Sequence, residues 1–243
     1  MHLNALRRNS RKIAEGPSDV LSARLCTFLN PYSYFLLRSH GSVLEKFDVI
    51  GVDGFSLCVI LRWMGVCNTP RLSFDMTSIA RDVLRHAERK GKSVFLVGTT
   101  RDHLDVATKS ILERFPQLKF CGTHHGYFNQ EEEQSLIDSI IKTRADIVIC
   151  GMGAIKQERF LAALAGRGWD GQGYSCGGFI HQIAKGGLEY YPSWINRWNL
   201  RWLFRIFDEP RLLKRYFLLY PIAMLILMKD AAGLRVSRRS ENS

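Results

Sequence analysis

Short apolar runs alternate with amphipathic stretches through the middle of the chain. Runs of four or five apolar, often β-branched residues bounded by turn signals are typical of strands buried in a sheet. Six segments of this kind lie at Leu25–Leu29, Phe47–Gly51, Val94–Gly98, Leu118–Cys121, Ile147–Cys150 and Tyr174–Cys176. We therefore predict six strands, spread from residue 25 to residue 176.

Two of the intervening stretches carry apolar residues at helical spacing. The repeating positions are Met76, Ile79, Val83, Leu84 and Ala87 in the first and Leu104, Ala107, Ile111, Leu112 and Phe115 in the second. Asp75 and Asp102 precede them as expected N-caps, and Gly91 and Pro116 are expected to end them. Strands separated by such helices indicate βαβ units. The predicted fold class is α/β: a Rossmann-like, mostly parallel sheet with flanking helices.

The pattern changes after Pro192. Aromatic and arginine residues are interleaved here, at Trp194, Arg197, Trp198, Arg201, Trp202, Phe204, Arg205 and Phe207. The apolar run Phe217–Met228 follows, and its 12 residues are too few to cross a bilayer, which takes about 20. Such a segment is typical of a helix lying in a lipid headgroup interface, and the alternative is a helix packed on the domain core.

These changes divide the chain into three expected parts. Residues 1–22 form a basic N-terminal tail, residues 23–192 the α/β catalytic domain, and residues 193–243 a basic and aromatic, membrane-associating helical appendage. No apolar segment resembling a signal peptide lies near the start, and the six cysteines form no Cys-x-x-Cys pair. Both features predict a reducing compartment, either the cytosol or the cytosolic face of a membrane.

Charge is concentrated at the two ends of the chain. The 243 residues carry a net charge of +11, of which residues 1–30 contribute +3 and residues 195–243 contribute +6. Basic ends suit nucleic acid or an anionic membrane surface, or they simply keep the protein soluble. The remaining +2 on the 164 central residues argues against a nucleic-acid-binding protein, which would need a basic surface throughout or a recognisable module.

Polar residues at the ends of the predicted strands are the candidates for chemistry, because ligands of parallel α/β sheets bind at the carboxyl ends of strands. Asp53 follows the second strand in a tight turn before a helix, where it is placed to act as a general base or to cap that helix. Asn30 ends the first strand before Pro31, as a ligand contact or a turn residue. Lys156-Gln157-Glu158 is a polar cluster at a helix start, with an exposed first turn as the alternative.

Phosphate and metal motifs are sparse. Gly98-Thr99-Thr100 closes the third strand at a helix N-terminus that favours anions, but neither a dinucleotide fingerprint nor a Walker loop is present. His124-His125 lacks metal-ligand spacing, and no Asp-x-Asp occurs. We therefore expect no metal and no cofactor, so that Arg, Lys or helix dipoles would hold a diphosphate.

Taken together, the order and spacing of these landmarks resemble the WecG/TagA/CpsF glycosyltransferase family (glycosyltransferase family 26). The resemblance runs from about Asn30 to Arg215. It is carried by Asn30, Val52-Asp53-Gly54, Arg71, Phe95-Leu96-Val97-Gly98, Gly122, Gly126-Tyr127-Phe128, Gly151-Met152-Gly153-Ala154-Ile155-Lys156-Gln157-Glu158, Trp202-Leu203-Phe204-Arg205 and Glu209-Pro210.

The resemblance implies an inverting transferase, of hexosyl or N-acetylhexosaminyl type, that moves a sugar from a UDP-sugar to a polyprenyl-diphosphate-linked glycan in exopolysaccharide, capsule or cell-wall polymer synthesis. It implies a peripheral enzyme on the cytoplasmic face of the plasma membrane. Asp53 would be the base, and the substrate-binding residues would be Asn30, Arg71, Gln157, Arg205 and Arg215. The chain departs from the family pattern at Phe28, His181 and Leu212, which leaves the sugar and acceptor open. A nicotinamide oxidoreductase is the other enzyme considered, and the missing glycine fingerprint weakens it.

Overall fold

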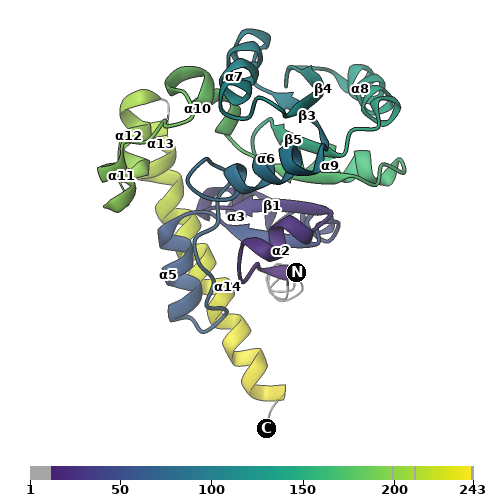
Figure 1. Cartoon of the computed structure of the whole chain (residues 1–243). Helices are drawn as coiled ribbons and strands as arrows, with labels where there is room; N and C mark the ends of the chain where they lie inside the picture. The colour runs from purple at the N-terminus through teal and green to yellow at the C-terminus, as the bar shows by residue number, and fades with distance from the viewer. Residues whose placement is uncertain (1–11, 199, 211, 242–243) are drawn as a thin grey trace.

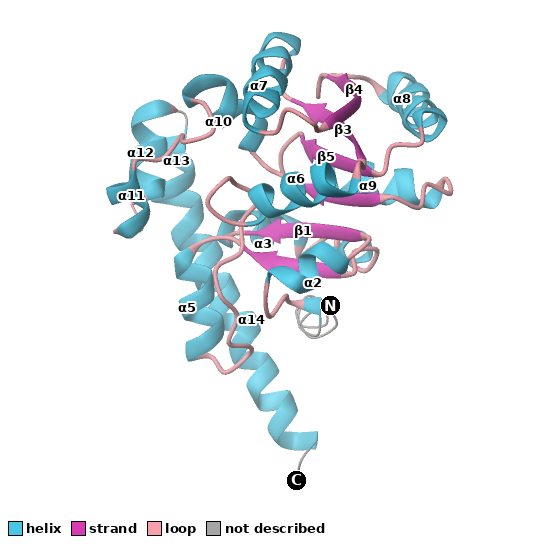
Figure 2. Ribbon diagram, viewed as in Figure 1, coloured by secondary structure: helices cyan, strands magenta, loops and turns pink. Residues whose placement is uncertain are grey.

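A computed structural model describes residues 12–198, 200–210 and 212–241 of the chain (Figure 1). Its centre is a six-stranded sheet in the order β2-β1-β6-β5-β3-β4, with every pairing parallel (Figure 2). The strands are β1 (Leu25–Leu29), β2 (Val49–Val52), β3 (Ser93–Gly98), β4 (Lys119–His124), β5 (Ile147–Gly151) and β6 (Gln172–Ser175). The predicted α/β fold and all six strands are confirmed, with shifts of a few residues at the strand ends.

Both faces of the sheet are buried. In β3, Val94 and Leu96 pack into the hydrophobic cluster on one face, and Phe95 and Val97 pack into the cluster on the other. One face is covered by α2 (Pro17–Ser22), α6 (Ile79–Lys90), α7 (Arg101–Arg114) and α10 (Phe179–Gly186), and the other by α3 (Pro31–Leu37), α4 (Gly41–Leu44), α5 (Phe55–Trp63), α8 (Gln130–Thr143) and α9 (Lys156–Gly166). Burial on both sides explains why the strands are apolar runs without alternation.

The ends of α6 and α7 test the expected helix signals. Gly91 ends α6 with φ +62°, and α7 ends just before Pro116, as predicted. The expected N-caps are wrong, because α6 begins after Ser78 and α7 after Thr100. Asp102 instead lies in the first turn of α7, where a carboxylate complements the helix dipole. The Asp75 carboxylate instead pairs with two arginines, as described below.

Residues 12–22, the described part of the expected N-terminal tail, lie against the sheet. Ile13 forms a parallel bridge with Ile50, and the Ala14 amide donates to the Ile50 carbonyl at 3.0 Å. Val20 of α2 is fully buried in the core. The packed domain therefore extends to the N-terminal side of residue 23.

The C-terminal appendage is helical and passes back beside the domain. It comprises α11 (Ser193–Arg197), α12 (Arg201–Asp208), α13 (Leu212–Lys214), the π-helical turn η2 (Arg215–Leu219) and α14 (Tyr220–Glu241). Helix α14 lies along α3 and α5 (Figure 1). Its Leu227 is fully buried, and its Asp230 accepts hydrogen bonds from the Tyr34 hydroxyl at 2.8 Å and from both Nε and Nη2 of Arg38, at 3.0 and 2.8 Å. One face of the appendage thus packs on the domain, the alternative considered for this segment.

Another side of the appendage is apolar and open. Phe217, Leu218 and Leu225 are each more than half exposed, as are Trp194 and Trp198. Within the described residues, no helix combines the length and the hydropathy needed to cross a bilayer. Membrane association of the appendage stays a prediction.

Candidate active site

A cavity of about 700 Å³ lies between the carboxyl ends of β1, β2, β5 and β6 and the C-terminal appendage. This volume falls within the range of about 300–1,000 Å³ that is usual for small-molecule sites. All six residues proposed from the sequence line it: Asn30, Asp53, Arg71, Gln157, Arg205 and Arg215. The fold therefore gathers into one site residues that come from five separate segments of the chain. Gly98, Thr99 and Thr100 are not among its lining residues.

The end of β2 positions Asp53. The Asp53 amide donates to the Leu29 carbonyl at 2.7 Å, which ties the turn to the end of β1. Gly54, with φ +116°, occupies the N-cap of α5, so the alternative role of Asp53 as that cap is wrong. The Asp53 side chain is 37% exposed where it lines the cavity, and its Oδ1 lies 3.4 Å from Nη2 of Arg71.

The surroundings of Asp53 tune its basicity. Burial raises the pKa of this carboxyl, Arg71 opposes the rise, and Asp75 adds to it, with a net upward shift. A carboxylate with a raised pKa holds a proton more strongly and is a better general base. Asp53 is thus equipped to take a proton from a hydroxyl group that enters the cavity.

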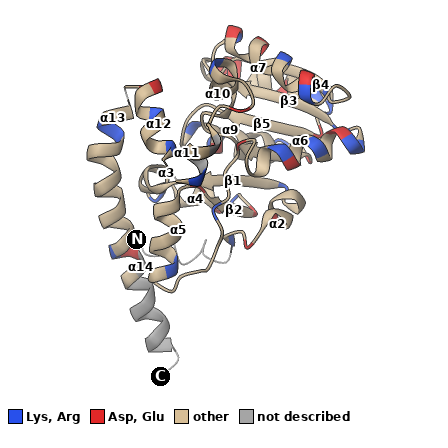
Figure 3. Cartoon of the chain, turned by 60° about the vertical axis from the view of Figure 1, so that its left-hand side comes forward, with Lys and Arg blue, Asp and Glu red and all other residues tan. Residues whose placement is uncertain are grey.

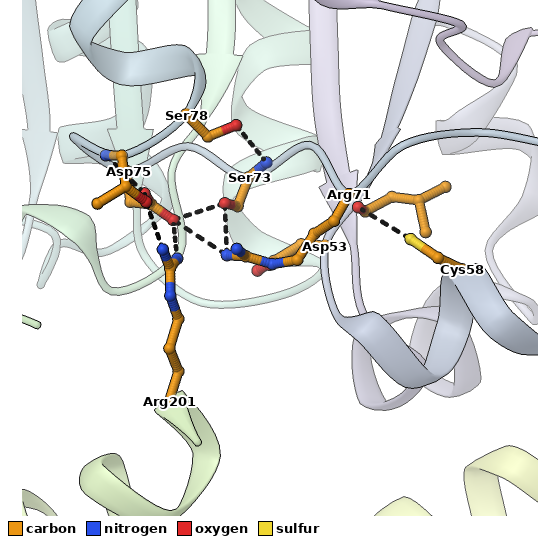
Figure 4. Close-up of polar contacts among 9 residues, drawn as sticks. Asp53, Cys58, Arg71, Ser73, Asp75, Ser78 and Arg201 are labelled. Carbon is orange, nitrogen blue, oxygen red and sulfur yellow. Dashed lines mark hydrogen bonds and ion pairs between the residues drawn. The ribbon is translucent and has the colours of Figure 1, made fainter. Parts of the chain in front are cut away.

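Asp75 joins two arginines from distant parts of the chain (Figure 4). Nη2 of Arg71 donates to the Ser73 hydroxyl at 2.7 Å and lies 3.2 Å from Oδ2 of Asp75. Nη1 of Arg201, in α12, donates to that same oxygen at 2.6 Å. The Arg201 Nη2 also donates to the Thr77 hydroxyl. A carboxylate near Asp53 thereby ties the appendage to the domain.

The bridge between Asp75 and Arg201 was not among the site residues predicted from the sequence. Burial would raise the pKa of Asp75, but Arg201 together with the Ser73 and Thr77 hydrogen bonds outweighs it and holds the pKa below its usual range. Asp75 therefore stays ionised. Its position before a helical repeat favoured a cap, and the interleaved arginines of residues 193–207 indicated a special segment without singling out Arg201.

Two further arginines of the appendage, Arg205 and Arg215, line the cavity. Nη2 of Arg205 donates to Oε1 of Glu209 at 3.0 Å, and the guanidinium carbon of Arg215 lies 4.1 Å from the centre of the Tyr32 ring. The Nε atoms of both arginines are buried without a hydrogen-bond partner in the described structure. A buried donor without a partner is costly to the fold.

Arg205 keeps its charge despite being enclosed. Burial acts to lower its pKa, but Tyr191, Tyr216 and Glu209 outweigh that effect and raise it. Across the described lining of the cavity, four arginines face three carboxylates. Planar guanidinium groups in excess over acids suit a diphosphate.

Asn30 and Gln157 are held by the protein itself. Oδ1 of Asn30 accepts from the Ser33 amide at 2.9 Å and caps α3, so its turn role is confirmed. Gln157 is 4% exposed; its Nε2 donates to Glu158 at 2.8 Å, and its Oε1 accepts from the Gly177 amide at 3.1 Å. The alternative of an exposed first turn at residues 156–158 is wrong for these two side chains, because Glu158 is also fully buried.

The two adjacent histidines lie away from this lining. Nδ1 of His124 lies 2.8 Å from the carbonyl of His125. Among the described residues, no three or more His, Cys, Asp or Glu side chains are grouped so that they could hold a metal ion. The expected absence of a metal is a prediction that an assay has to test.

Comparison with known proteins identifies the family. The model of the glycosyl transferase WecG/TagA/CpsF family matches residues 4–237. The chain belongs to this family. A UDP-Gal:alpha-D-GlcNAc-diphosphoundecaprenol beta-1,4-galactosyltransferase from Shigella boydii is 35% identical over 196 residues, which cover 80% of this chain and 81% of that protein.

A relative of lower identity is named for the transfer of a different sugar. An N-acetylglucosaminyldiphosphoundecaprenol N-acetyl-beta-D-mannosaminyltransferase from Bacillus subtilis (strain 168) is 24% identical over 194 residues, which cover 79% of this chain and 73% of that protein. The protein is therefore a glycosyltransferase, as the landmarks predicted, and the nicotinamide oxidoreductase alternative is set aside.

Proposed function

We propose that this glycosyltransferase moves a hexose from a UDP-sugar, with inversion, to a saccharide carried on polyprenyl diphosphate. The reaction serves the synthesis of a bacterial exopolysaccharide, capsule or wall polymer. The observation that carries the proposal is a single cavity in which the Asp53 carboxylate faces a cluster of four arginines, in a chain of this family.

The chemistry follows from that arrangement. An acceptor hydroxyl attacks the anomeric carbon of the donor while Asp53 takes its proton. The bond from that carbon to the diphosphate oxygen breaks, and UDP leaves with the bonding electrons. Arg205 and Arg215 stabilise the negative charge that develops on the diphosphate. Asn30 and Gln157 each offer amide hydrogens beyond those their described hydrogen bonds use, which would orient the sugars.

The relatives narrow the choice of donor. The Shigella boydii protein is named for UDP-Gal and the Bacillus subtilis protein for N-acetylmannosamine. The higher identity to the first favours galactose. Of the departures at Phe28, His181 and Leu212, Phe28 and Leu212 line the cavity and His181 does not. Phe28 and Leu212 are therefore the two placed to affect the choice of sugar.

The location of the acceptor favours a peripheral enzyme at the cytoplasmic face of the membrane. Residues 195–243 carry a net charge of +6, and Phe217, Leu218 and Leu225 are exposed on the same segment. Basic residues near an anionic surface contribute about 1 kcal/mol each, and exposed apolar side chains add to binding. We expect UDP-sugar, lipid-linked acceptor and anionic membrane as partners, and no nucleic acid.

A panel of UDP-sugars tests the proposal. The full chain is incubated with synthetic GlcNAc-diphosphoundecaprenol and each donor in turn, and the product is followed by mass and by the configuration of the new linkage. We expect one hexose, galactose first, to be transferred with a β linkage. Absence of transfer from every UDP-sugar, or retention of the donor's configuration, would contradict it.

A further inference from the structure

The cavity has an apolar end as well as a polar one. Part of its wall is formed by Phe55 at the start of α5 and by Phe217, Pro221 and Met224 of η2 and α14. Phe55 is 57% exposed and Phe217 64% exposed, so both stand at the rim. The wall thus changes from arginine to hydrocarbon within one turn of helix.

The apolar rim continues along α5. Val59 and Trp63 follow Phe55 at intervals of four residues and are 46% and 67% exposed, while Leu57 and Leu61 on the other side of α5 are buried. Residues spaced by four lie on one face of a helix. A row of three large apolar side chains therefore leads from the mouth of the cavity along the surface of the catalytic domain.

The two helices that border this row are uncharged where they approach each other. Residues 55–61 of α5 and residues 216–228 of η2 and α14 contain no Asp, Glu, Lys or Arg. In Figure 3 the two helices run side by side and are tan over these turns, with charged positions only beyond them. A surface of this kind fits a hydrocarbon and not a charged peptide or a nucleic acid.

We propose that this rim and row form the subsite for the isoprenoid chain of the acceptor. The inference rests on the proposed function, since it is the lipid diphosphate that brings the chain to the cavity. The acceptor diphosphate enters the polar part of the cavity, and the first isoprene units are bonded directly to it. They pass between Phe55 and the η2–α14 junction, and the chain continues past Val59 on its way to the bilayer.

Size and continuity select this occupant. A cavity of about 700 Å³ has to hold the donor and the acceptor saccharide, so a long polyprenyl chain has to leave it. An exit lined by Phe55, Phe217 and Met224 keeps that chain out of water. The catalytic domain, through α5, thereby takes part in recognising the lipid together with the appendage.

The test compares acceptors that differ only in their lipid. Wild type, Phe55→Gln and Val59→Gln are assayed in detergent with GlcNAc diphosphate carrying either an undecaprenyl chain or a methyl group. Val106→Gln is the matched control, because Val106 is 47% exposed on α7 and does not line the cavity. Thermal unfolding of each variant confirms that these surface changes leave the fold intact.

We expect Phe55→Gln to raise the KM for the undecaprenyl acceptor about tenfold, with Val59→Gln weaker and Val106→Gln without effect. The KM for the methyl acceptor should not change. Equal effects of Phe55→Gln on both acceptors, no effect on either, or a wild type that does not distinguish the two acceptors would overturn the subsite.

Two further outcomes separate the competing explanations. If Phe55→Gln weakens binding to acceptor-free anionic vesicles and leaves the KM in detergent unchanged, the row contacts the bilayer and the subsite is rejected. If wild type transfers sugar to neither acceptor from any UDP-sugar, the proposed function fails, and the subsite falls with it. If the Phe55→Gln and Val59→Gln variants lose affinity only for the undecaprenyl acceptor, the result supports both the subsite and the proposed function.

Discussion

The two sides of the cavity hold their arginines in different ways. On the domain side, which we call the floor (Asp53, Arg71 and Asp75), Arg71 is fixed by two carboxylates and the Ser73 hydroxyl. On the appendage side, the roof (Arg205 and Arg215), Arg215 rests on the Tyr32 ring, and among the described residues no carboxylate lies within 4 Å of it. The floor arginine thus has hydrogen-bonding partners within the protein, whereas the Nε atoms of both roof arginines are buried without a hydrogen-bond partner in the described structure.

This difference assigns the two sides different tasks. The floor holds Asp53, the proposed base, at a set position, and a proton acceptor works best when its surroundings are already organised. Of the two roof arginines, Arg205 is paired with Glu209, and Arg215 has no carboxylate partner among the described residues, so a bound anion would neutralise the charge of Arg215. We proposed above that the leaving diphosphate lies at the roof. Because this diphosphate gains negative charge as its bond to the sugar breaks, the roof would then stabilise the transition state more than the ground state.

The appendage that carries the roof also packs on the domain. Leu227 of α14 is buried against α3 and α5, and Asp230 is the acid partner of Arg38. Ending the chain at Pro192 would expose that apolar surface and leave Arg38 unpaired. Single substitutions in the full chain therefore separate floor from roof better than truncation does.

The largest effect is expected for the base of the floor. Asp53→Asn retains the size of the side chain and removes the basic oxygen, so turnover should fall by about 10²–10⁴ with the fold intact. Initial rates and thermal unfolding measure the two properties. The matched control is Asp102→Asn, in the first turn of α7, which should keep full rate. Full activity in Asp53→Asn would contradict the assignment of Asp53 as the general base.

The second-largest effect is expected for the roof. Arg215→Ala removes the charge and the guanidinium, and we expect kcat to fall by about 10² with a smaller change in KM, as for the loss of one transition-state donor. Arg215→Lys keeps a point charge without the planar donors and should recover part of the rate. A change in KM alone for Arg215→Ala would show that the roof binds substrate without acting on the leaving group.

The bridge between floor and roof should have a smaller effect. Asp75→Asn weakens two ion pairs at once, and we expect kcat/KM to fall about tenfold and the free energy of unfolding to fall by about 2 kcal/mol. Denaturant unfolding measures the second quantity. The double variant with Arg201→Gln tests the link, since the two losses should be less than additive if the residues act together. Strict additivity would contradict the bridge.

Asp75 also shows where sequence reasoning stops. The strands were predictable because a sheet buried on both faces requires strands that are continuous apolar runs. The helix ends at Gly91 and Pro116 were predictable because both residues end helices through local backbone chemistry. An ion pair between Asp75 and Arg201 spans 126 residues and leaves no local pattern. Capping and bridging both call for an aspartate, so only the folded geometry distinguishes them.

The candidate site divides in the same way. Asp53 and Asn30 could be located because both follow strands whose carboxyl ends share one edge. Gln157 could be located in the polar cluster Lys156-Gln157-Glu158, although its role came from the family resemblance. Arg71, Arg205 and Arg215 were placed by that resemblance alone, because periodicity does not reveal them. The role of Phe55 is hidden for a different reason: an apolar residue on a helix is expected in a core, and its 57% exposure appears only in the structure.

The pH dependence of kcat/KM should depend on the Asp53–Arg71 pair of the floor, with a more modest effect than the substitutions above. Asp53 must be ionised to accept a proton, so kcat/KM falls as the pH drops through its pKa, which burial raises above the ordinary aspartate value. Arg71 opposes that rise, and Arg71→Gln should therefore move the acid limb to higher pH. The position of the limb, and not the size of the rate, is the measurement. An unchanged or lower limb in Arg71→Gln would contradict the pairing.

The smallest expected effect is that of a chelator. The sequence has no Asp-x-Asp, and the described cavity presents Arg71, Arg201, Arg205 and Arg215 where a diphosphate would need positive charge. Guanidinium groups can stabilise a leaving diphosphate without a metal ion. We therefore expect the initial rate to be unchanged after exhaustive EDTA treatment and dialysis.

The same assay on Arg215→Ala sharpens the comparison between floor and roof. If roof charge takes the place of a cation, added Mg²⁺ or Mn²⁺ should leave the wild-type rate unchanged and should restore part of the rate only where the arginine is missing. A wild-type activity that disappears with EDTA and returns with either ion would show that the roof arginines alone do not neutralise the diphosphate.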